Sequence, residues 1–132
     1  MLANDDPADF FAARRTGKRG ADRDWIDWYY AFALLLRRDF ALAADVLLPL
    51  SVQARDALVA GLAAFFLEDT LAKALPARSA ELVAAAAAAR DRVLAKLPTK
   101  AAWDKEIDRG GAAIHIVVLN KSLAEAGARF YA

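Results

Sequence analysis

Cysteine is absent from this 132-residue chain, and histidine occurs once, as His115. Without cysteine the chain cannot form disulfides, thiolate metal sites or a cysteine nucleophile. A single histidine cannot supply the paired ligands of a helical zinc or di-iron site, and no His-Glu-x-x-His motif is present. The sequence therefore predicts no metal site and no cofactor.

An excess of charge of one sign and long apolar runs are also lacking. Eighteen basic residues stand against seventeen acidic ones, so the total charge favours neither nucleic acid nor a membrane surface. The longest stretches without charge are about ten residues, whereas a membrane span needs roughly twenty. The amino-terminal residues are acidic, unlike the basic start of a signal peptide. We expect a cytoplasmic protein without membrane contact.

Glycine and proline are scarce, with six and four residues, and they fall mainly between apolar runs. This punctuation is typical of helices joined by short turns. The predicted helices span about 6–15, 25–48, 51–75, 79–97, 99–109 and 112–128, with a bend of the second near Arg38-Asp39 as an alternative to a straight helix. Their expected caps are Asp6, Asp22 or Asp24, Ser51, Ser79 and Thr99, and Pro49, Pro76 and Pro98 are expected to stop helices.

The fold class expected from this pattern is all-α, a compact bundle of five to six helices. Residues 1–132 form one domain in this interpretation, with residues 1–24 as a mobile amino-terminal arm in one alternative. The β-branched residues between positions 112 and 119 would also suit a strand. We prefer a helix there, because a lone strand would have no partner and the apolar residues that follow continue at helical spacing.

Two predicted helical segments, residues 25–36 and 57–67, are apolar on nearly all sides. Such helices lie at the centre of a core or are shared with another chain. Aromatic residues are enriched at the centres of protein interfaces, so the candidate partner-binding residues are Trp25, Trp28, Tyr29 and Phe32. In the alternative, both helices are simply the innermost of the bundle. Small residues at 57, 61 and 64 would let another element approach closely, which favours packing.

A basic cluster precedes the second predicted helix and consists of Arg14, Arg15, Lys18, Arg19 and Arg23. These side chains could bind nucleic-acid phosphates or an acidic partner. The alternative is a solvated connector, since nearby aspartates oppose the positive field and no aromatic residue interleaves with the cluster.

Arg109 and His115 bracket the sequence Gly-Gly-Ala-Ala-Ile. This Arg-x5-His spacing resembles the ribonuclease motif of HEPN domains, which are small all-α bundles. The resemblance implies a homodimer cleft in which His115 moves a proton at the ribose oxygens and Arg109 stabilises the phosphate. In the alternative, Arg109 is a cation at a helix end and His115 is a partly buried helix residue.

Two classes of function remain after these arguments. The first is a non-enzymatic interaction module or small regulator that binds another protein or itself through the aromatic helices. The second is a nucleic-acid-associated protein that uses the basic cluster, with a HEPN-like ribonuclease as its enzymatic form. The scarcity of catalytic residue types favours the first class and leaves the question of an enzyme open.

Overall fold

The computed structural model describes residues 7–18, 20–109 and 117–132, without the side chains of Pro7, Ala21 and residues 117–119. Every regular element in these ranges is a helix, which confirms the all-α prediction. The longer helices are α1 (Pro7–Arg15), α2 (Gly20–Leu36), α3 (Phe40–Gln53), α4 (Ala57–Phe66), α6 (Ser79–Lys96), α7 (Lys100–Arg109) and α8 (Val117–Phe130). A π-helical turn (Leu67–Leu71) and the short α5 (Ala72–Ala74) extend α4, and a 3-10 turn (Pro76–Arg78) precedes α6.

The predicted count of five to six helices is too low, because the expected helix 25–48 is two helices. Arg38 has a φ of 61° and lies in the left-handed region that commonly ends helices. The amide of Asp39 donates back to the Leu34 carbonyl at 3.0 Å. The Asp39 side chain then accepts from the Leu42 amide and starts α3. A chain reversal therefore replaces the expected bend.

Proline and serine have other roles in α3 than predicted. Pro49 lies inside α3 on an exposed side, one turn before the helix ends, where the loss of one amide donor is tolerated. Ser51 is fully buried within the same helix and donates to the Leu48 carbonyl at 2.7 Å. The cap of α4 is Asp56, whose carboxylate accepts from the amides of Leu58 and Val59.

The remaining predicted caps have mixed outcomes. Thr99 caps α7 as expected, because its hydroxyl accepts from the Ala102 amide at 3.1 Å. Ser79 is the first residue of α6, and the cap position falls on Arg78, which makes no side-chain cap. Asp24 lies inside α2, which begins at Gly20. The cap prediction at Asp6 and residues 112–116 of the ambiguous segment lie outside the described residues, and helix α8 begins at Val117.

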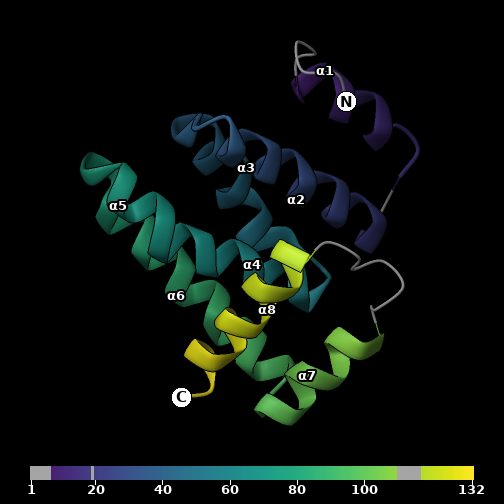
Figure 1. The fold of residues 1–132 in the computed structure, drawn as a ribbon, viewed down its shortest axis with the longest axis vertical. Helices are drawn as coiled ribbons and strands as arrows, with labels where there is room; N and C mark the ends of the chain where they lie inside the picture. Colours follow the sequence, from purple (N-terminus) through teal and green to yellow (C-terminus); the bar gives the residue numbers. More distant parts are fainter. Residues whose placement is uncertain (1–6, 19, 110–116) are drawn as a thin grey trace.

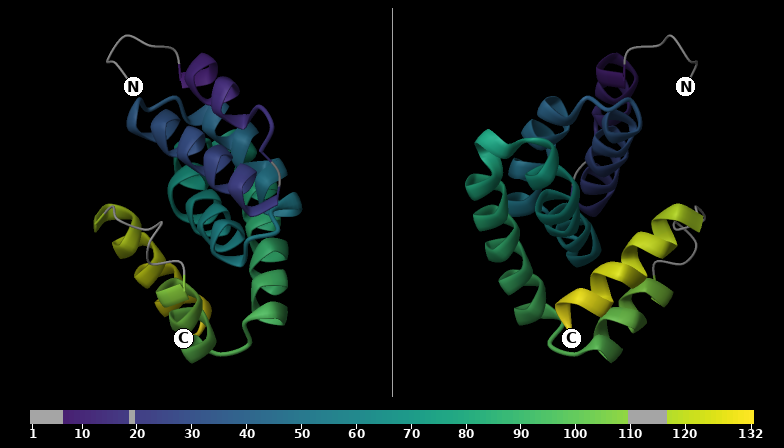
Figure 2. Two further views of the ribbon diagram at one scale, coloured as in Figure 1. Left: turned by 90° about the vertical axis from the view of Figure 1, so that its right-hand side faces the viewer. Right: turned by 60° about the vertical axis from the view of Figure 1, so that its left-hand side comes forward.

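Helix α4 occupies the centre of the fold, and all its residues from Leu58 to Phe65 are buried. It packs against α3, α6 and α8, with smaller contacts to α2 and α7. Helix α1 lies on α2 at one end of the molecule, and α7 lies at the other end (Figure 1). Figure 2 shows α7 and α8 side by side. They are joined to the rest through the connection from α6 to α7 and through the contacts of α8 and α7 with α4.

Two aspartates join α2 to the beginning of α4. The buried Asp24 carboxylate accepts from the amides of Arg55 and Asp56 at 2.7 and 3.0 Å. Asp56 in turn accepts from the Trp25 indole N–H at 3.0 Å while it caps α4. The two carboxylates therefore satisfy backbone and indole donors that would otherwise be left without partners.

Trp103 fastens α7 to the core. Its ring is fully buried, and its indole N–H donates to the Leu123 carbonyl of α8 at 3.0 Å. Gly61 of α4 and Gly127 of α8 face the ring, and a Cβ built at these positions would lie 2.5 and 2.6 Å from its atoms. Of the small residues noted in α4, Gly61 therefore makes room for an indole ring.

We expect Asp24→Ala to lower the free energy of unfolding by about 1–3 kcal/mol, because two partly buried amides lose their acceptor. Asp22→Ala is the matched control, since Asp22 is exposed on the same helix. Urea denaturation of both variants measures the difference. Equal stability of the two variants would contradict the structural role of Asp24.

Gly127→Ala should cost about 1–3 kcal/mol through overpacking against Trp103, although alanine is the better helix former by about 1 kcal/mol. In a Trp103→Leu background the same substitution should be neutral or stabilising, because the clash is removed. A double-mutant cycle from thermal denaturation checks this coupling. Stabilisation by Gly127→Ala in the original background would show that the indole does not occupy this position.

Candidate binding surfaces

An apolar groove runs between α1 and α2. Its volume is about 560 Å³, within the range of roughly 300–1,000 Å³ that is usual for binding sites. Its floor and walls are apolar or aromatic and consist of Phe11, Ile26, Tyr29, Phe32, Ala33 and Leu36. The two charged side chains that line it, Arg14 and Lys18, are both cations. Leu36 is 74% exposed at the end of α2.

The local structure explains why this groove has a basic edge. The guanidinium of Arg14 lies 3.7 Å from the centre of the Phe10 ring and donates to the Phe10 carbonyl. The cation is thereby held on α1 beside the apolar lining. Phe11 packs against Tyr30 of α2 at a ring distance of 5.7 Å, which fixes α1 on α2.

The four predicted partner-binding residues do not share one surface. Tyr29 and Phe32 are half-buried and line the groove. Trp28 is 1% exposed and packs against Phe32 and Phe66 in the core. Trp25 is half-buried and holds Asp56 through its indole N–H. Of the four, only Tyr29 and Phe32 are placed where a partner could reach them in the groove.

A second cavity, which we call the polar pocket, has a volume of about 710 Å³. It lies between the first turns of α2, the last turns of α3 and the turn before α4. Its charged lining consists of Arg15, Arg23, Asp24, Asp27 and Arg55, and its other lining residues include Tyr30, Val46, Pro49 and Leu50. Arg15 approaches Asp27 at 2.6 Å, and Arg23 approaches the same carboxylate at 3.9 Å.

The predicted basic cluster is divided between these two cavities. Arg14 and Lys18 line the apolar groove, whereas Arg15 and Arg23 line the polar pocket and pair with Asp27. Arg19 lies outside the described residues. Binding of nucleic acid by this cluster stays a prediction.

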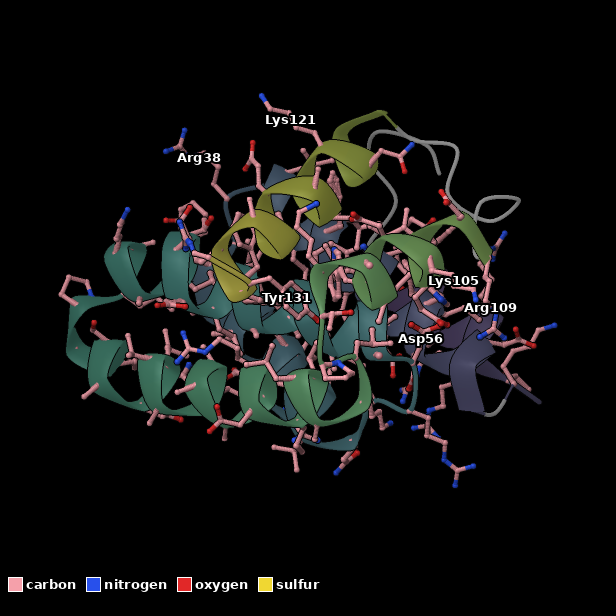
Figure 3. All side chains as sticks on the ribbon, turned by 90° about the horizontal axis from the view of Figure 1, so that it is seen from below. Arg38, Asp56, Lys105, Arg109, Lys121 and Tyr131 are labelled. Atoms are coloured by element: carbon pink, nitrogen blue, oxygen red, sulfur yellow. The ribbon has the colours of Figure 1, made fainter. Side chains whose placement is uncertain are left out.

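The HEPN-like pair is described only in part. Arg109 is the last residue of α7, is 73% exposed and pairs with Glu106 at 3.2 Å. Figure 3 shows it at the edge of the molecule, on the same helix as Lys105. His115 lies outside the described residues, so the ribonuclease hypothesis stays a prediction.

No group of three or more histidine or acidic residues that could hold a metal ion occurs in the described part of the chain. Within the same residues, no helix has both the length and the apolar character needed to cross a bilayer.

The selected partner-binding set lacks Phe11, Ile26 and Leu36, which line the groove, and Arg55 of the polar pocket was not predicted. Ile26 and Leu36 fall at helical spacing with Tyr29 and could have been found by following one face of α2. Arg55 carries no such signal, because it lies in a turn that reaches α2 only through tertiary contacts.

The ionisation of Asp27 provides a test of the polar pocket. Burial raises the pKa of this carboxyl above its ordinary value of 3.8, Asp24 adds to the rise, and Arg15 and Arg23 oppose it. The folded chain then binds this proton more tightly than the unfolded chain. Stability from this group is therefore present at low pH and declines as pH rises from 3.8 through the folded pKa.

A carbon-13 NMR titration should give Asp27 a pKa above 3.8, and Arg15→Gln should raise it further by removing the nearer cation. A pKa at or below 3.8 would contradict the burial of Asp27 in this pocket.

No curated protein and no solved structure matches the chain. A family model described as "Uncharacterised Treponema protein" matches residues 1–132, so the chain belongs to this family.

Proposed function

We propose that this protein is a helical interaction module that binds an amphipathic helix of a partner protein in the groove between α1 and α2. The observation that carries the proposal is the composition of the groove: an apolar lining, a strongly exposed Leu36 and cations as its charged residues. Exposed apolar surface rimmed by polar residues marks interaction sites in soluble proteins.

The positive charge at the edge of the groove favours a partner with acidic side chains. Arg14 and Lys18 form no ion pair with a described residue, so both cations are available to acidic side chains. An amphipathic helix with aspartate or glutamate beside its apolar face would satisfy the groove and its edge together. A helix with a basic border would be repelled.

The apolar lining explains why a helix is preferred to an extended peptide. Residues 26, 29, 33 and 36 repeat at the spacing of one helix face, so the groove follows the axis of α2. A partner helix lying along α2 can place residues at i, i+3 or i+4 and i+7 against this row. Strand addition would need a free sheet edge, and the described chain is helical.

Site-specific photocrosslinking tests the proposal. A photoreactive phenylalanine analogue at position 26 should crosslink, in cells of the native host, to a segment with helical apolar periodicity and acidic flanks. Mass spectrometry identifies the segment, and a synthetic peptide of that segment then allows the affinity to be measured.

Leu36→Glu should weaken binding of that peptide about tenfold or more, since it puts a carboxylate in the apolar groove. Val52→Glu is the matched control, because Val52 is 65% exposed on α3 and does not line the groove. A crosslink to a second copy of the chain would overturn the partner proposal in favour of self-association. Equal loss of affinity in both variants, or a crosslinked segment without the stated pattern, would also overturn it.

A further inference from the structure

We propose that the polar pocket binds a small molecule that carries a carboxylate or phosphate group on an apolar body. This site is separate from the groove between α1 and α2, and its ligand is independent of the partner helix. The proposal depends on two features of the pocket: arginine N–H donors that are not engaged in hydrogen bonds with described residues, and an apolar wall in the same lining.

The carboxylates of the pocket are already occupied by the protein. Asp24 accepts from the backbone amides of Arg55 and Asp56. Asp27 faces Arg15 at 2.6 Å and Arg23 at 3.9 Å. Three guanidinium groups therefore share a pocket with two carboxylates, one of which serves backbone donors. The lining carries one positive charge more than negative.

The arginines retain most of their hydrogen-bonding capacity. No hydrogen bond joins the terminal nitrogens of Arg15, Arg23 or Arg55 to another residue in the described part of the chain. Each guanidinium carries five N–H donors, and its planar fork matches the oxygens of a carboxylate or phosphate. Arg55 makes no described ion pair at all, although its backbone is held at both the amide and the carbonyl. Its side chain is thus an available cation on a fixed backbone.

The apolar wall favours a ligand that has an apolar body attached to its anionic group. Val46, Pro49 and Leu50 line the pocket from α3, and Tyr30 lines it from α2. A volume of about 710 Å³ exceeds what one oxyanion fills and lies in the range of small-molecule sites. An aliphatic or aromatic body against this wall, with its oxyanion toward Arg23 and Arg55, uses both parts of the lining.

NMR titration of the full chain tests the proposal with four defined probes: phenyl phosphate, benzoate, inorganic phosphate and acetate. We expect saturable amide shifts around residues 23–30 and 53–56 with phenyl phosphate or benzoate. The aromatic probe that binds should do so about tenfold more tightly than its counterpart without a ring, because the wall excludes water from the ring. The stronger of the two aromatic probes then shows whether phosphate or carboxylate is preferred.

Variants connect this binding to the arginines. Arg55→Gln combined with Arg23→Gln should weaken the aromatic probe about tenfold or more. Arg90→Gln combined with Lys105→Gln removes the same charge from α6 and α7, outside the pocket, and should leave affinity unchanged. The backbone bonds of Arg55 do not depend on its side chain, and unchanged thermal denaturation verifies the fold.

Three results would overturn the proposal. The first is the absence of saturable shifts with all four probes. The second is equal affinity for aromatic and ring-free probes, which would show an adventitious ion contact only. The third is equal weakening by the pocket pair and the control pair, which would show non-specific attraction to the net charge.

Discussion

The carboxylate of Asp24 in α2 accepts hydrogen bonds from the amides of Arg55 and Asp56 at the beginning of α4. The carboxylate of Asp56 in turn accepts from the Trp25 indole of α2. This exchange sets where α2 lies relative to the central helix. Residues of α2 line both cavities, so the position of α2 determines the shape of both. The polar pocket contains Asp24 itself, and the groove lies along another side of the same helix. A buried carboxylate is tolerated here because backbone donors satisfy it.

Helix α2 divides its residues among three faces at helical spacing. One face is buried against the core, one lines the polar pocket and one lines the apolar groove. This division explains why the helix looks apolar on nearly all sides in the sequence. The core requires one apolar face, Phe11 of α1 packs against Tyr30 on another, and Leu36 remains 74% exposed. The excess of apolar surface thus becomes a groove, which supports binding as the proposed function.

The helical class, the cap at Thr99 and the approximate positions of most helices could be predicted, because helix propensity and capping act over a few residues. A bend near Arg38 could be predicted, but neither the complete break there nor the continuation of α3 through Pro49 could be. Both depend on whether a helix has a buried face that keeps its backbone in place, and that face exists only when α3 packs on α2 and α4. Ser51 likewise looked like a cap from its position after proline, but burial of α3 makes it an interior residue.

The sequence by itself determined the helical class, the absence of cysteine chemistry and the aromatic character of α2, since these follow from composition and local spacing. Only the tertiary structure decided which aromatic residues are reachable. It buried Trp28, used Trp25 to hold Asp56 and left Tyr29 and Phe32 in the groove. It also separated the basic residues into two cavities, because neighbours along a helix point in different directions about its axis. The polar pocket around Arg55 has the same origin: its charges come from segments that meet only in the fold.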